Sequence, residues 1–113
     1  MKIKTQDLTG AALDWAVARA LGKRSSLFIS QRTGALAAEH HYSTNWAQGG
    51  PLIERGRISI RPDISTPDFR AFVIRTPEGM SHRYIGPTPL ISAMRCFVAS
   101  KFGDEVDVPE ELL

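Results

Sequence analysis

The stretch 85–103, IGPTPLISAMRCFVASKFG, constrains the fold more than any other part of the sequence. Thr88 places a side-chain acceptor at the N-cap position, and Pro89 follows at the first helical residue, where its missing N–H has no cost. Gly103 stands where a left-handed residue ends a helix. The sequence therefore predicts a helix over residues 88–102 that is capped at both ends.

This helix has two faces of different composition. At about 100° per residue, large apolar side chains share one arc, which is typical of a face buried on a core. They are Leu90, Ile91, Met94, Phe97, Val98 and Phe102. The opposite arc carries small residues, namely Ser92, Ala93, Cys96, Ala99 and Ser100. Because a solvated face normally carries charges, we expect a second backbone to approach this arc, either a helix of the same chain or a partner subunit in a homodimer. An exposed face that merely lacks charge is the alternative.

Length and cysteine content indicate a broad class. The 113 residues suit one domain, 1–113, with a single core. One cysteine excludes an intrachain disulfide framework and favours a reducing compartment. No apolar run is long enough to span a membrane, and the charged start does not resemble a signal peptide. We therefore expect a cytoplasmic protein without a membrane partner.

The net charge of +2 hides an uneven distribution. Residues 1–103 hold all 14 Lys and Arg against 7 of the acids, whereas residues 104–113 hold 5 acids and no base. Val106 and Val108 alternate with acids in this last segment, so we expect it to dock on the body as an edge strand. The basic body favours a nucleic acid or another polyanion as partner, with ordinary solvated surface as the alternative.

The remaining elements follow in order along the chain. A helix is expected from Thr9 to Gly22, and a single helical turn at 44–48, ended by Gly49-Gly50-Pro51. Strands are expected over 25–32, 35–43, 57–61, 69–76 and 80–86, although 35–43 alone would read as helical. This order predicts an α+β fold, in which an N-terminal helix and a C-terminal helix lie on one face of an antiparallel sheet of about four strands built from hairpins.

Three stretches resemble a known family: TGAALDWAVA, STNWAQGGPLIE and GPTPLISAMRCFVASKFGDEVDVPEEL. Together they are similar to the NinX-like proteins, small uncharacterised proteins of lambda-like phages and of prophages in enterobacteria. The resemblance implies a phage or prophage origin and a bacterial host cytoplasm, and it implies no activity. Residues that match the family's motifs are Trp46, Gln48, Gly49, Gly50, Pro51, Gly86, Pro87, Thr88, Pro89 and Arg95. Asn45 stands where the family has an aspartate.

Metal, cofactor and catalytic sites are not expected. His40, His41, His82 and Cys96 have none of the spacings of metal motifs. The thiol lies in the middle of a helix, away from the N-terminus that would lower its pKa, so it reads as packed and inert. The Gly-Gly and Gly-Pro-Thr stretches match no phosphate-binding loop. A small enzyme with an unrecognised site is the remaining alternative.

A nucleic-acid surface is a further alternative. Arginines occur on three expected strands, at Arg57, Arg61, Arg70, Arg75 and Arg83. On one shared face they would track phosphates with salt-dependent affinity. Side-chain alternation argues against one face, because Arg70 shares its side with the apolar residues 72 and 74.

We expect the leading function to be non-enzymatic protein interaction. The expected binding surface combines two groups of family-like residues: Trp46, Gln48, Gly49, Gly50 and Pro51 with Gly86, Thr88 and Arg95. A host or phage protein would be the partner. For the tryptophan, a core position that fixes the loop is the alternative to a recognition role.

Overall fold

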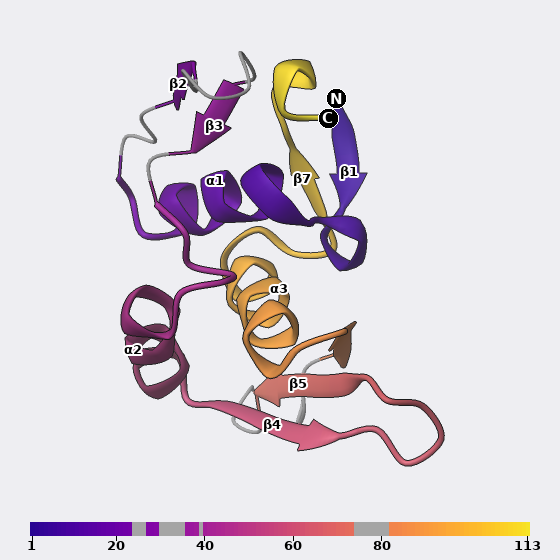
Figure 1. Cartoon of the computed structure of the whole chain (residues 1–113). Coiled ribbons are helices and arrows are strands. Elements are labelled where there is room, and N and C mark those ends of the chain that lie inside the picture. The colour runs from indigo at the N-terminus through magenta and orange to yellow at the C-terminus, as the bar shows by residue number, and fades with distance from the viewer. Residues whose placement is uncertain (24–26, 30–35, 39, 74–81) are drawn as a thin grey trace.

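A computed structural model of the chain describes residues 1–23, 27–29, 36–38, 40–73 and 82–113. The described residues form an α+β fold, as the sequence predicts (Figure 1). The helical elements are η1 (Thr5–Asp7), α1 (Gly10–Ala20), α2 (Trp46–Gly56), α3 (Pro89–Phe102) and η2 (Glu110–Leu112). The strands are β1 (Lys2–Lys4), β2 (Leu27–Ile29), β3 (Leu36–Ala38), β4 (Ile58–Pro62), β5 (Phe69–Val73), β6 (Tyr84–Gly86) and β7 (Glu105–Asp107).

The strands form three antiparallel sheets in place of the single sheet expected. β1 pairs with β7, β2 pairs with β3, and β4, β5 and β6 form a three-stranded sheet with β5 in the centre. The return strand expected over 35–43 is present at 36–38. β1 and β7 come from opposite ends of the chain, and α2 lies in sequence between the β2–β3 hairpin and the three-stranded sheet.

Helix α3 lies at the centre of the molecule and has the predicted ends. The Thr88 hydroxyl accepts a hydrogen bond from the Ile91 N–H at 3.1 Å, and Gly103 has φ +82°. The helix packs against α1 and α2 on one side and against the three-stranded sheet on the other (Figure 1). A second backbone approaches the small-residue arc, where Ser92 and Cys96 are buried, but it belongs to the sheet and not to the helix or partner subunit that was expected.

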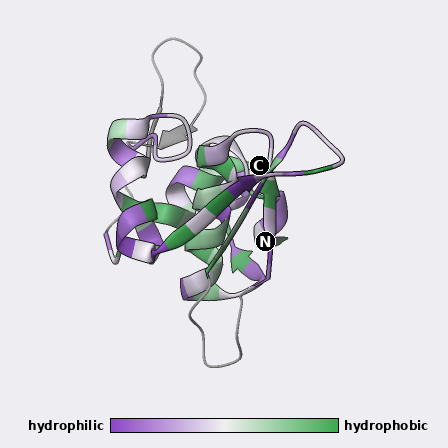
Figure 2. Cartoon of the chain, turned by 90° about the horizontal axis from the view of Figure 1, so that it is seen from below, coloured by the Kyte–Doolittle hydropathy of each residue, from purple (hydrophilic) through white to green (hydrophobic). Residues whose placement is uncertain are grey.

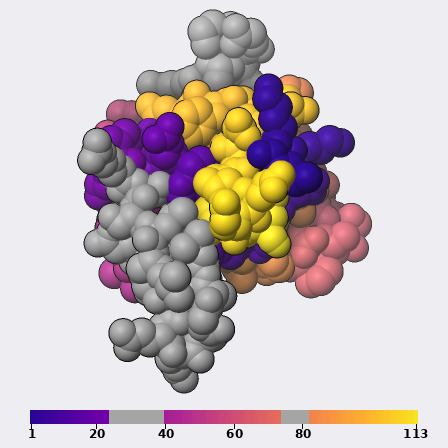
Figure 3. Space-filling view, turned by 90° about the horizontal axis from the view of Figure 1, so that it is seen from above, coloured from indigo at the N-terminus to yellow at the C-terminus, as the bar shows by residue number. Residues whose placement is uncertain are grey.

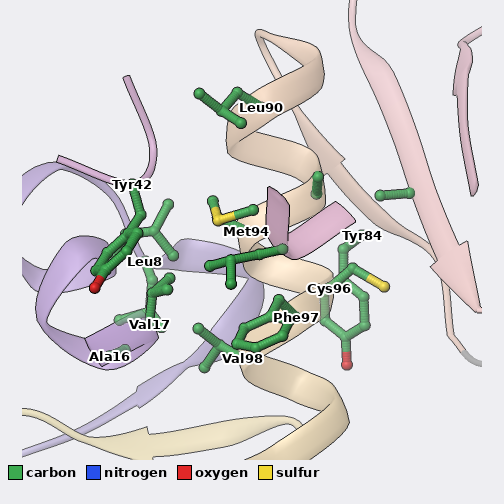
Figure 4. Close-up of a cluster of buried hydrophobic side chains, with 14 of the residues drawn as sticks. Leu8, Ala16, Val17, Tyr42, Tyr84, Leu90, Met94, Cys96, Phe97 and Val98 are labelled. Carbon is green, nitrogen blue, oxygen red and sulfur yellow. The ribbon is translucent and has the colours of Figure 1, made fainter. Parts of the chain in front are cut away.

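The two arcs of α3 face different layers. Cys96 points toward Tyr84 of the sheet, whereas Met94 and Val98 point toward α1 (Figure 4). A side chain at Gly86 of β6 would come within 2.7 Å of the Ser92 nitrogen, so the sheet approaches the small arc closely. Most of the large apolar arc therefore packs between the helices, although Phe102 at its end is exposed, and the small residues let the sheet come near.

Helix α1 crosses α3 and does not lie on the three-stranded sheet. Its described neighbours include α3 and β3, so the expectation that both helices cover one sheet face is not met. Ala12 and Ala16 are buried at the crossing, and these small side chains allow the close approach expected from an alanine-rich helix. Thr9 is the N-cap residue, and Gly22 follows the helix with φ +76°.

Helix α2 corrects the expected single turn at 44–48. It continues through Gly49-Gly50-Pro51 to Gly56, and neither of the first two glycines has a positive φ. Arg57 ends the helix in the left-handed region at φ +50°, which delays the following strand by one residue. Gly49 and Gly50 are typical of a turn in sequence. In the structure Gly49 lies inside a helix, because the packing described below leaves no space for a side chain at this position.

The acidic segment lies beside the start of the chain. Ile3 pairs with Val106, while Lys2 and Lys4 stand opposite Asp107 and Glu105, so unlike charges face each other across the ladder. Seen from above, the C-terminal segment and the N-terminal residues are neighbours on the surface (Figure 3). In the described part of the chain, no helix is long and apolar enough to cross a membrane.

Candidate functional site

The segment before α2 is fixed by hydrogen bonds of its own. The Asn45 side chain accepts from the Ala47 N–H at 2.9 Å, which is an N-cap bond, and the Asn45 N–H donates to the His41 carbonyl at 2.8 Å. The Gln48 side-chain oxygen accepts from the His41 N–H at 2.7 Å. The first residue of α2, Trp46, is thereby held on a rigid backbone.

Trp46 lies outside the core. Its relative exposure is 56%, so the alternative in which it plugs the core is wrong. The indole lies near Gly50, where an added Cβ would be 3.6 Å from a ring carbon, in ordinary contact. Ala47 and Pro51 are exposed on the same side of the helix. We call these four residues the Trp46 surface: Trp46, Ala47, Gly50 and Pro51.

Gly49 lies on the opposite, buried side of α2. A Cβ at this position would collide with the Tyr42 carbonyl oxygen and would come within 2.8 Å of the Leu90 side chain. Only glycine lets α2 approach both groups so closely. This contact brings the start of α2 beside the start of α3, so the two groups of family-like residues are neighbours.

Most of the expected α3 residues have structural roles. Arg95 donates from Nε to the Leu8 carbonyl at 2.9 Å and from Nη1 to the Ile85 carbonyl, and burial lowers its pKa. The Gln6 side chain pairs with both backbone groups of Ile85, accepting from its N–H at 2.8 Å. Thr88 caps α3 as described above. The Arg95 guanidinium therefore connects the end of η1 to β6, and its hydrogen bonds are made within the chain.

The arginines of the alternative surface are divided. Arg57 ends α2, and Arg61 and Arg83 are exposed, whereas Arg75 lies outside the described residues. Arg61 pairs with Arg70 across β4 and β5, which places both on one face of the sheet. Arg70 does share its side with Phe72, as expected, but this side points away from α3, because Ala71, fully buried, is the residue that faces the helix.

Sequence reasoning missed a buried acid, Asp14 of α1. The residue is 4% exposed, and its carboxylate accepts from the Ser43 N–H at 2.8 Å. Burial raises the pKa of Asp14, and the bonds from Ser43 oppose this shift. The available signal was its place beside Leu13 and Val17, on the apolar side of an alanine-rich helix, where an acid needs a partner.

A shallow cleft of about 350 Å³ lies between β6 and the paired ends of the chain. Its lining mixes bases and acids: Lys4, Gln6, His82, Arg83, Tyr84, Asp104 and Glu105. The Tyr84 hydroxyl donates to the Asp104 carboxylate at 2.7 Å, and burial together with this bond raises the pKa of Tyr84. No group of three potential metal ligands occurs within the described residues, and Cys96 is buried.

Comparison with known proteins gives one family. No curated protein matches the chain. The family described as Bacteriophage P22, NinX matches residues 4–101. That span is most of the chain, and it contains the Trp46 surface, the α3 cap and Arg95. The chain therefore belongs to the phage P22 NinX family.

Proposed function

We propose that this phage-family protein is a non-enzymatic interaction module that acts in the host cytoplasm and binds a host or phage protein through the Trp46 surface. The observation that carries the proposal is the 56% exposure of Trp46 on a backbone held by three hydrogen bonds. The indole is a large apolar side chain whose burial would be favourable, yet the fold leaves most of it exposed.

The geometry suits an anchor residue. Interfaces draw most of their binding energy from a few large side chains that enter pockets of the partner, and tryptophan is enriched among them. Because the Asn45 cap and the Gln48 bond already order the backbone, binding loses little further conformational entropy. Pro51 on the same side of α2 stiffens the surface further.

The remaining family-like residues support this surface from behind. Gly49 lets α2 pack closely against α3, and the Gln48 side chain accepts a hydrogen bond from the segment before α2. The proposal therefore separates the expected site into a contact group, Trp46 and Pro51, and a supporting group, Gly49, Gly86, Thr88 and Arg95. Substitutions in the contact group should affect binding alone, and those in the supporting group should affect folding as well.

The test is capture of partners by tagged protein from nuclease-treated lysate of a bacterial host. We expect a discrete protein to bind wild type, and to be lost with Trp46→Ala while the melting temperature changes by less than about 2 °C, because little surface is buried. Phe102→Ala is the matched control: it removes another aromatic that is exposed, at 44%, near the far end of α3.

Two results would count against the proposal. One is capture that survives Trp46→Ala unchanged. The other is a fall in melting temperature of several degrees for that variant, which would assign the indole a packing role. Light scattering at high concentration separately tests the homodimer through residues 88–102, for which a monomer would be the contrary result.

A further inference from the structure

The three-stranded sheet has an outer face, opposite α3, on which cations surround an aromatic ring. The register places Arg61, Arg70 and Ile85 in one row across the sheet, and Ser59 beside Phe72 in the next row. Continuing the alternation one residue before Tyr84 places Arg83 across from Phe72. We use the term outer face for these six residues: Ser59, Arg61, Arg70, Phe72, Arg83 and Ile85.

This face is uncovered by the described helices. Helix α3 packs on the other side, where Ala71 and Tyr84 are buried. Figure 2 views the chain from below, the side on which this sheet lies in Figure 1. On the outer face, Ile85 is 37% exposed, Arg61 and Arg83 are exposed, and Phe72 is half-buried. An aromatic ring on the central strand is thus accessible between flanking cations.

The acids near this face decide which cations are available. Asp63 forms an ion pair with Arg70, so that guanidinium is already partnered. Asp63 and Asp68 are joined by a backbone hydrogen bond at the β4–β5 turn, beyond the Arg61 row. Arg83 borders the cleft that contains Asp104 and Glu105. Arg61 and Arg83 form no ion pair in the described part of the chain, and they lie on opposite sides of Phe72.

We propose that the outer face binds single-stranded nucleic acid, with an unpaired base stacked on Phe72 and backbone phosphates at Arg61 and Arg83. Proteins that bind single strands combine cations that follow the phosphates with aromatic rings on which bases stack. A duplex keeps its base faces stacked within the helix, so it can use the arginines but not the ring. This surface is separate from the Trp46 surface and does not depend on it.

The test is fluorescence anisotropy of the full chain with labelled dT12, U12 and a 12-base-pair duplex. We expect both single strands to bind more tightly than the duplex. With two phosphate contacts on a single strand, the slope of log affinity against log salt is about −1.4, so raising salt from 50 to 200 mM weakens binding about sevenfold. Tighter binding of U12 assigns RNA as the ligand, and tighter binding of dT12 assigns DNA.

Variants separate the charge contribution from stacking. Arg61→Gln with Arg83→Gln should weaken binding at 50 mM salt about tenfold and flatten the salt slope. Phe72→Leu should weaken binding about fivefold or more with the slope unchanged, and Phe72→Tyr should retain binding, because it keeps a stacking ring. Arg19→Gln with Arg55→Gln, on α1 and α2, removes the same charge elsewhere and should have little effect.

Three outcomes would overturn the proposal: no saturable binding at 50 mM salt, equal affinity for the duplex, or equal weakening by the α1 and α2 control. Each variant is first shown to melt cooperatively like wild type. If Phe72→Leu alone does not melt like wild type, the affinities of Phe72→Tyr and of the Arg61→Gln with Arg83→Gln variant still test whether the outer face binds single strands. Loss of the Trp46 surface does not alter these affinities, so the two proposals fail independently.

Discussion

The buried Asp14 carboxylate offers a direct test of how the fold holds together. It lies in α1, is 4% exposed, and accepts from the Ser43 N–H at 2.8 Å. Asp14→Ala leaves that N–H, on a residue only 3% exposed, without an acceptor. Such a loss costs about 1–3 kcal/mol of unfolding free energy. Asp14→Asn keeps an oxygen acceptor for that N–H, removes the charge and replaces the second carboxylate oxygen with an NH2 donor.

The expected shift in melting temperature follows from chain size. Unfolding entropy is about 2.1 cal/mol/K per residue, or ~0.24 kcal/mol/K for this chain. A loss of about 1–3 kcal/mol therefore lowers the melting temperature of Asp14→Ala by about 4–13 °C. Asp14→Asn should lie close to wild type. Circular dichroism at 222 nm during heating measures both variants.

The dependence on pH has a defined sign. Burial raises the pKa of Asp14 in the folded state above its model value of 3.8, so the folded chain binds this proton more tightly than the unfolded chain does. Stability from this group is complete below pH 3.8 and declines as pH rises through the folded pKa. The stability of Asp14→Asn relative to wild type should therefore increase between pH 4 and pH 7.

Denaturant unfolding at several pH values checks this sign, with Glu54→Gln, an exposed acid on α2, as the control. If the stability of Asp14→Asn relative to wild type falls as pH rises, burial does not raise the pKa of Asp14. A loss of less than about 0.5 kcal/mol for Asp14→Ala would show that the Ser43 N–H has another acceptor or reaches water.

Other substitutions probe local geometry. Gly49→Ala should lower the unfolding free energy by about 1–3 kcal/mol in thermal melts, because its Cβ would collide with the backbone carbonyl of Tyr42. Gly50→Ala should be neutral or stabilising, because its Cβ would make only ordinary van der Waals contact. Equal losses for the two variants would contradict this expectation. Thr88→Ala removes the α3 cap and should lower the melting temperature by about 4 °C, from a loss of about 1 kcal/mol, with Thr88→Ser close to wild type. Asp63 should titrate by NMR at a pKa of about 2, because the Thr66 hydroxyl and then Arg70 favour its charged form, and a normal value would mean that the turn opens in solution.

Local signals in the sequence predicted α1 and α3 well, but not α2. The Thr88-Pro89 start and the Gly103 end of α3 depend on residues next to one another, and both are present in the structure. The small arc of this helix also predicted a second close neighbour. These features need no knowledge of what packs where, since caps and faces are properties of the helix itself.

The errors arose where distant residues decide the local structure. Gly49 reads as a turn residue, but its lack of a side chain serves a contact with Tyr42 and Leu90 inside a helix. Phe72 reads as a core residue, but Ala71 is the one that faces α3, because a small residue fits where the helix approaches the sheet. The position of Asp14 on the apolar side of α1 indicated that it needs a partner, but the sequence could not identify Ser43, which lies 29 residues away.

The pairing of Gln6 with Ile85 has a consequence for how the molecule behaves in a crowded cell. β6 is an outer strand of its sheet, and such strands expose backbone groups that can recruit another chain and seed aggregation. Here one side-chain amide occupies both the N–H and the carbonyl that Ile85 turns outward. Gln6 of η1, together with Arg95 on the same carbonyl, thus occupies the outward backbone groups of this edge and disfavours its pairing with another copy of the chain.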